Sequence, residues 1–385
     1  MKIFVPRETL RAETRVAMVP ATAGKLVKLG AEIVIETGLG ASVYFADDEY
    51  RAAGAAIEAD RDAALSAADM VLRVRKPPDE EIPRLRQGCI QVSYLDPFNE
   101  IALVRSLAAA GISAIAMEMI PRSTVAQKMD ALSSQASLGG YVAVLLAANR
   151  SPHIFPMMMT PSGTIRPARV FVIGVGVAGL QAIATARRLG ASVSAFDTRP
   201  VVEEQVRSLG AKFIKVDLGE TGQTEQGYAK ALTPEQLDKQ REAMATECAE
   251  SDVVITTAQV FGRKAPLIMT TAMVERMRPG SVIVDMAIES GGNVECARLD
   301  EEVEVGGVRV IGFANLPGRV ARTASQMYSN NLGNLVEHFW DKQAKTFRLD
   351  PSDPLLAGCL VTHAGQICHE NIRKLAQQGG PSDAR

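Results

Sequence analysis

The stretch Ala-Arg-Val-Phe-Val-Ile-Gly-Val-Gly-Val-Ala-Gly-Leu-Gln-Ala-Ile-Ala, residues 168–184, decides the fold. The apolar, β-branched run Arg169–Ile173 predicts a buried strand, and the alanine-rich run that follows predicts a helix. Between them lies the pattern G-x-G-x-x-G, at Gly174, Gly176 and Gly179. This order of strand, glycine turn and helix is typical of a dinucleotide-binding α/β domain.

Each glycine of this pattern has a physical role. Gly174 permits the tight turn, Gly176 lets the backbone approach a pyrophosphate, and Gly179 lets the helix press against the strand. Val177 and Ala178 begin the helix, whose free N–H groups and partial positive charge attract phosphate. The alternative, a glycine-rich turn without a ligand, accounts less well for the flanking elements.

The acidic residue Asp197 ends the next predicted strand, Ser192–Asp197. A carboxylate there accepts a hydrogen bond from a ribose 2′-hydroxyl and repels a 2′-phosphate, which favours NAD(H) over NADP(H). Arg199, just after Thr198, could instead pair with a 2′-phosphate. It could also lie flat on the adenine ring, where a guanidinium stacks well.

Two series of strands alternate with helices along the chain. The alternation predicts an α/β fold with two Rossmann-like domains, each with a mainly parallel doubly wound sheet, joined by long helices around a cleft. We expect domain boundaries at residues 1–135 plus 325–385 for the first domain and 136–324 for the second. The second series comprises six strands, expected to be parallel, at 169–173, 192–197, 212–214, 253–256, 281–285 and 308–312.

Composition excludes several functions. A net charge of −2 and an aromatic content of 5% argue against nucleic-acid binding. No apolar run looks long enough to cross a membrane, and the N-terminus lacks signal-peptide features. The five cysteines are odd in number and form no CxxC pair, which fits a reducing cytoplasm, and the four histidines lack zinc-site spacing, so we expect no metal.

A polar segment with three glycines, Leu218–Thr233, interrupts the second series. A loop of this length inside a compact domain is usually functional. Its less polar centre, Tyr228 and Ala229, suggests a lid, although a tolerated surface insertion is the alternative.

No histidine lies where a general base for a dehydrogenase is expected, and this absence is informative. Polar residues instead gather between the two series, at Arg122, Gln127, Asp130 and Ser133. They could hold a nicotinamide ribose and carboxamide without taking part in proton transfer. The alternative is a polar helix N-terminus with an ion pair.

The sequence resembles the NAD(H)-binding domain of proton-translocating nicotinamide nucleotide transhydrogenases, in a wider family that includes alanine dehydrogenase. The resemblance covers essentially the whole chain. It is carried by Pro121–Ser123, Gln127–Gln135, Gly174–Ala182, Phe196–Arg199, Gly227–Lys230 and Val284–Asn293.

The resemblance implies direct hydride transfer from NADH to NADP⁺, with NADP(H) bound by a partner subunit and protons moved by membrane-spanning subunits. It also implies a homodimer, peripheral on the cytoplasmic face of the inner membrane without inserting into it. The implied catalytic residues are Arg122, Gln127, Asp130, Ser133 and Tyr228, and the implied cofactor contacts are Gly174, Gly176, Val177, Ala178, Gly179, Asp197, Thr198, Arg199, Gly227, Gln240 and Gln259.

Departures from alanine dehydrogenases argue against the amino-acid reaction. By the resemblance, Asp96 replaces a catalytic histidine, Arg75 a substrate-binding lysine and Glu289 an active-site aspartate. Two alternatives stay open, an alanine dehydrogenase-like oxidoreductase and a non-catalytic NAD-sensing module.

Overall fold

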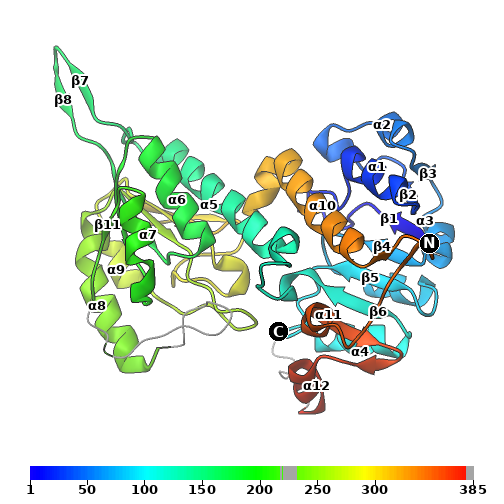
Figure 1. Cartoon of the computed structure of the whole chain (residues 1–385). Coiled ribbons are helices and arrows are strands. Elements are labelled where there is room, and N and C mark those ends of the chain that lie inside the picture. The colour runs from blue at the N-terminus through cyan, green and yellow to red at the C-terminus, as the bar shows by residue number, and fades with distance from the viewer. Residues whose placement is uncertain (217–218, 220–231, 379–385) are drawn as a thin grey trace. The chain divides into compact units, whose positions relative to one another are not determined.

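The computed structural model describes residues 1–216, 219 and 232–378. The chain divides into two compact units, unit 1 (Met1–Gln135 with Gly318–Arg385) and unit 2 (Ala136–Pro317). Each unit is built on one large, mainly parallel sheet with helices packed on it (Figure 1). The predicted α/β class is therefore confirmed.

The sheet of unit 2 has the strand order β11-β10-β9-β12-β13-β15-β14. All its pairings are parallel except that of β14 with β15. The order changes direction at β9, so the carboxyl ends of β9 and β12 flank the place where open α/β sheets bind ligands. The strands are β9 (Arg169–Ile173), β10 (Ser192–Phe196), β11 (Lys212–Phe213), β12 (Val253–Thr256), β13 (Val282–Asp285), β14 (Glu302–Val305) and β15 (Val308–Ile311).

The helices of unit 2 follow its strands, and a separate hairpin projects from the unit (Figure 1). An apolar core that includes Phe171, Met244 and Ile283 lies between the sheet and these helices. The helices that follow these strands are α6 (Val177–Arg188), α7 (Glu203–Ser208), α8 (Pro234–Glu250) and α9 (Thr271–Glu275), and the hairpin is β7 (Met158–Thr160) with β8 (Gly163–Ile165).

The sheet of unit 1 has the order β19-β18-β6-β5-β4-β1-β2-β3. The strands from β6 to β3 are parallel, and β18 joins β6 in the antiparallel direction. The strands are β1 (Lys2–Val5), β2 (Glu32–Glu36), β3 (Ala56–Glu58), β4 (Met70–Leu72), β5 (Ile90–Ser93), β6 (Ser113–Ala116), β18 (Leu360–His363) and β19 (Gln366–Ile367).

The helices of unit 1 come from both of its chain segments, and α10 packs against α1. A short antiparallel pair, β16 (Trp340–Asp341) and β17 (Thr346–Phe347), follows α10. The helices are α1 (Pro20–Lys28), α2 (Asp47–Ala52), α3 (Arg61–Ala67), α4 (Ile101–Ala109), α10 (Ala321–His338), α11 (Pro354–Cys359) and α12 (Glu370–Gln377).

One helix corrects an expectation from the sequence. Among the described residues, α5 (Ala131–Arg150) is long and apolar enough to cross a membrane by length and composition, with a mean hydropathy of 1.4. Within unit 2 it packs tightly on α6, because a Cβ at Gly140 would lie 2.1 Å from the carbonyl oxygen of Ala178. Close helix packing of this kind is what a core helix of a globular protein shows.

The strand predictions need two further corrections. The six strands predicted for unit 2 are present and parallel to one another, but the sequence did not indicate β14, which adds an antiparallel edge. In unit 1, β18 and β19 extend the sheet from the C-terminal part of the chain, which the sequence did not indicate as strands.

Candidate nucleotide-binding site

The glycine turn after β9 has the geometry of a phosphate cradle. Gly174 has a φ of 96°, which favours glycine. A Cβ at Gly179 would lie 1.9 Å from the Gly174 carbonyl oxygen, so this close approach excludes any side chain. In front of Gly176, by contrast, a Cβ would meet no atom of the described residues within 4 Å. The turn therefore leaves no room for a side chain at Gly179, whereas the space next to Gly176 is open among the described residues.

The N-terminus of α6 faces this open space. Gly176 is its N-cap and supplies no side-chain hydrogen bond. The following residues, Val177 (39% exposed) and Ala178, begin the helix at the surface. Because the first-turn N–H groups of a helix lack intrahelical partners, they can bind the oxygens of a pyrophosphate.

The neighbouring strand end supports the turn. The Thr257 hydroxyl, just after β12, donates a hydrogen bond to the carbonyl oxygen of Gly174 at 2.9 Å. Gln259 follows in the same loop, and its side-chain amide donates to the Met286 carbonyl at 3.3 Å. Gln259 therefore lies on the carboxyl edge of the sheet.

Asp197 lies just past β10, beside the turn. Its carboxylate accepts a hydrogen bond from the Val175 N–H at 2.7 Å. The guanidinium of Arg199 also contacts this carboxylate through two nitrogens, at 2.9 and 2.8 Å. Arg199 is therefore an ion-pair partner of Asp197 in this structure. Thr198 lies between the two, partly buried.

One other predicted contact is buried. Gln240 is only 3% exposed, on α8, where it faces the interior. Gly227 and Tyr228 lie outside the described residues, as does most of the segment predicted to be a lid.

In unit 1 the structure brings Asp130 and Ser133 together. Asp130 caps the N-terminus of α5, because its carboxylate accepts the Ser133 N–H at 2.8 Å and the Ser133 hydroxyl at 2.6 Å. Gln127 lies exposed in the preceding 3₁₀ turn, Gln127–Met129, and lines an open hollow with Thr124, Val125 and Lys128. Arg122 lies earlier in the same loop.

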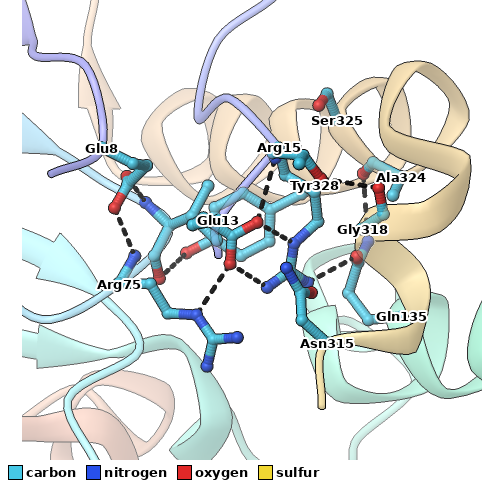
Figure 2. A network of polar contacts seen from close by, with 12 residues as sticks. Glu8, Glu13, Arg15, Arg75, Gln135, Asn315, Gly318, Ala324, Ser325 and Tyr328 are labelled. Atoms are coloured by element: carbon cyan, nitrogen blue, oxygen red, sulfur yellow. Dashed lines mark hydrogen bonds and ion pairs between the residues drawn. The ribbon is translucent and has the colours of Figure 1, made fainter. Parts of the chain in front are cut away.

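The carboxyl edge of unit 1 carries a buried ionic network that the sequence did not reveal (Figure 2). Glu13 pairs with Arg15 through two hydrogen bonds, at 2.8 and 2.7 Å, and accepts another from Arg75 at 2.7 Å. Arg15 also donates to the Gln135 side chain at 2.9 Å. Burial alone would raise the pKa of Glu13, but the bonds and charge of Arg15, with the charge of Arg75, lower it to about 2.

Two more glutamates bind backbone N–H groups at this edge. Glu8 accepts from Val74 and Arg75, just after β4, at 2.6 and 3.2 Å. Glu118 accepts from Leu95 and Asp96, just after β5, at 2.8 and 2.5 Å. Burial raises the pKa of each carboxyl to about 7, against these backbone bonds.

None of the four histidines is part of the nucleotide cradle of unit 2. His363 corrects one expectation, because it does end a strand, β18. Its ring contacts the Ser113 hydroxyl at 2.9 Å, at the start of β6 and thus at the edge opposite the carboxyl ends. His338 and His369 belong to unit 1, and His153 is exposed after α5. Among the described residues, no cluster of three metal-binding side chains occurs.

The sheet order of unit 2, the glycine turn and the strand-end aspartate together define a dinucleotide-binding α/β protein. The chain belongs to the alanine dehydrogenase/PNT family. The model of the family's N-terminal domain matches residues 4–139, and that of its C-terminal domain matches residues 143–370.

Curated relatives identify the nearer branch. The chain is 44% identical to an NAD(P) transhydrogenase alpha-subunit chain of Rhodospirillum rubrum, over 96% of this chain and 98% of that protein. It is 42% identical to NAD(P) transhydrogenase subunit alpha of Cereibacter sphaeroides, over 95% of this chain and 71% of that protein. Alanine dehydrogenase of Halomonas elongata is 32% identical, over 97% of this chain and 96% of that protein.

Solved structures agree with this order. Transhydrogenase from Sinorhizobium meliloti is 43% identical and superposes with a TM-score of 0.85, over 95% of this chain and 100% of that one. An L-alanine dehydrogenase is 26% identical with a TM-score of 0.79, over 98% and 99% of the two chains. The resemblance to transhydrogenase alpha subunits is therefore confirmed, and family membership implies NAD(H) binding.

Proposed function

We propose that this chain is the NAD(H)-binding subunit of a proton-translocating transhydrogenase. It presents NADH for direct hydride transfer to NADP⁺ held by a partner subunit, while membrane-spanning partners move the protons. The observation that carries the proposal is a built nucleotide cradle whose described strand ends hold no histidine, in a chain 44% identical to a transhydrogenase alpha subunit.

Hydride transfer between two nicotinamide rings needs no general base. Its requirement is two rings held at near-attack distance with water excluded. By resemblance, Arg122, Gln127, Asp130 and Ser133 act on the nicotinamide end, with Gln127 directed at the second nucleotide. Tyr228 and Gly227 act as a lid.

The cradle residues take the other half of NAD(H). The first-turn N–H groups of α6 bind the pyrophosphate, and Asp197 with its neighbours binds the adenosine. Gln259 and Gln240 are further proposed contacts. The burial of Gln240 favours an indirect role, through packing of α8.

A homodimer is part of the proposal, at the cytoplasmic face of the membrane and without insertion into it. The β7–β8 hairpin supports self-association, since an isolated two-stranded hairpin is marginally stable alone. Its large apolar side chains are exposed, with Met159 at 75% and Ile165 at 48%. Met159→Asp should shift the sedimentation coefficient from dimer to monomer, whereas Ser162→Asp at the exposed hairpin turn should not. A monomeric wild-type chain would contradict this part of the proposal.

The deciding experiment mixes the pure chain with a transhydrogenase NADP(H)-binding domain and follows hydride exchange between NADH and an NADP⁺ analogue. Exchange that depends on the partner supports the proposal. Oxidation of alanine by the chain alone would establish the alanine dehydrogenase alternative, which the likeness to the Halomonas elongata enzyme keeps open. Tight NADH binding without exchange would favour an NAD sensor.

A further inference from the structure

Both carboxylate oxygens of Asp197 already accept hydrogen bonds from protein N–H groups, mostly from Arg199. An aspartate that only binds a ribose does not need these bonds. Oδ1 of Asp197 accepts from the Arg199 N–H at 2.8 Å and from Arg199 Nε at 2.9 Å. Oδ2 accepts from the Val175 N–H at 2.7 Å and from Arg199 Nη2 at 2.8 Å. The side chains of Asp197 and Arg199 are only 6% and 13% exposed, respectively.

These bonds fill the acceptor capacity of the carboxylate. A carboxylate has about four lone-pair sites, two on each oxygen. All are occupied by Val175 and Arg199. A ribose 2′-hydroxyl can therefore bond to Asp197 only by taking over a site that one of these N–H groups now holds, two of which belong to the guanidinium.

Arg199 is fixed at the same time against the cradle. Its Nη2 also donates to the carbonyl oxygen of Val175, in the glycine turn, at 3.1 Å. The hydrogen bonds of Asp197 raise the pKa of this guanidinium, so it stays charged. A cation suited to phosphate thus lies at the strand end where the 2′ position of an adenosine ribose is expected.

We propose that Arg199 is able to bind a 2′-phosphate, and that its ion pair with Asp197 prevents this binding. Discrimination against 2′-phosphorylated nucleotides is then set by the ion pair, and not by the carboxylate alone. The inference rests on the proposed nucleotide site and names its specificity determinant.

The charges explain why the pair discriminates. A 2′-phosphate carries about −1.5 to −2 charges at neutral pH. It meets a carboxylate that repels it and a guanidinium whose donors to Asp197 are already used. With the carboxylate charge removed, the guanidinium fork matches phosphate oxygens well. Arg199, whose charge Asp197 otherwise neutralises, then attracts the 2′-phosphate.

The test uses the full chain and the adenosine half of the ligand, with 5′-AMP and 2′,5′-ADP as probes in calorimetry. Asp197→Asn keeps an acceptor for the Val175 N–H and removes the charge. It should tighten 2′,5′-ADP binding roughly ten- to a hundredfold relative to wild type, the range expected for charge-assisted hydrogen bonds. The double variant Asp197→Asn/Arg199→Ala should lose that gain. Arg199→Ala alone should favour 5′-AMP over 2′,5′-ADP more strongly than wild type does.

Two results would overturn the inference. One is a double variant that binds 2′,5′-ADP as tightly as Asp197→Asn. The other is an Asp197→Asn chain that binds 5′-AMP but gains nothing for 2′,5′-ADP. Asp197→Ser replaces Asp197→Asn should the latter fail to fold. Failure of the wild-type chain to bind either 5′-AMP or NADH would instead contradict the proposed function itself.

Discussion

The two units differ at the carboxyl ends of their parallel strands. In unit 2 the described residues leave a space open in front of Gly176, at the carboxyl end of β9 and beside a helix N-terminus without a side-chain cap. In unit 1 the chain's own carboxylates close it, since Glu8 and Glu118 bind the backbone N–H groups after β4 and β5. Glu13 forms ion pairs with Arg15 and Arg75. The fold thus supplies a potential ligand edge twice, and the side chains decide which edge is available.

Breaking the ionic network should give the largest effect. Glu13→Ala leaves the buried guanidinium of Arg15, 4% exposed, without its carboxylate partner. Removing one partner of a buried pair costs about 3–5 kcal/mol, so the free energy of unfolding in urea should fall by this amount. Glu32→Ala, which breaks the exposed pair with Lys2, should cost less than about 1 kcal/mol.

A similar loss in both variants would mean that the closed edge of unit 1 contributes little stability. NADH affinity of the folded Glu13→Ala chain is the second measurement. It should stay close to wild type, because the cradle belongs to unit 2 and the ionic network contains none of the residues proposed to act on the nicotinamide end.

A side chain placed in the open space next to Gly176 should have a smaller effect, and it should change NADH affinity more than stability. Gly176→Ala adds a methyl group where no atom of the described residues lies within 4 Å, in a backbone conformation with φ of −83° that alanine adopts. The unfolding free energy should change by less than about 1 kcal/mol. NADH binding should weaken roughly tenfold or more, because the pyrophosphate can no longer approach the backbone.

Gly24→Ala in α1 is the matched control, since its Cβ would make only ordinary contacts, the nearest at 3.5 Å. It should leave NADH affinity unchanged. Equal NADH affinity of Gly176→Ala and wild type would remove the turn from the binding site.

The smallest predicted effect concerns pH. The folded-state pKa of about 7 for Glu118 lies above its ordinary value of 4.5. The folded chain therefore binds more protons between these values, and its stability declines as the pH rises through 7. Glu118→Gln keeps the acceptor for Leu95 and Asp96 without the charge. At pH 8 it should be more stable than wild type by about 1–2 kcal/mol, with a flatter profile between pH 5 and 8.

Glu13 has the opposite sign, because its folded-state pKa is about 2. Its contribution is present above a pH of 4.5, its ordinary pKa, and is lost as the pH falls through 2, below the window in which Glu118 titrates. Glu80→Gln, at an exposed position, is the control and should leave the profile of unfolding free energy unchanged. An identical pH slope for Glu118→Gln and wild type would contradict the assignment.

Local patterns account for what the sequence could predict. The strands of unit 2 and the glycine turn were predictable because apolar runs and glycine spacing are properties of neighbouring residues. The antiparallel strands β14 and β18 were not, because their pairing depends on contacts with β15 and β6 formed only in the folded chain.

The same limit applies to the polar contacts. Asp197 was placed correctly at its strand end, but its pairing with Arg199 depends on one choice of side-chain conformation. Likewise, no spacing rule predicts that Glu118 binds the N–H groups of Leu95 and Asp96, which lie far from it in the sequence.

The most direct test of this contrast between the edges is a structure of the chain with NADH bound. We predict the pyrophosphate within hydrogen-bonding distance of the first-turn N–H groups of α6, in front of Gly176. A nucleotide bound instead at Arg15 and Arg75 of unit 1 would contradict this prediction.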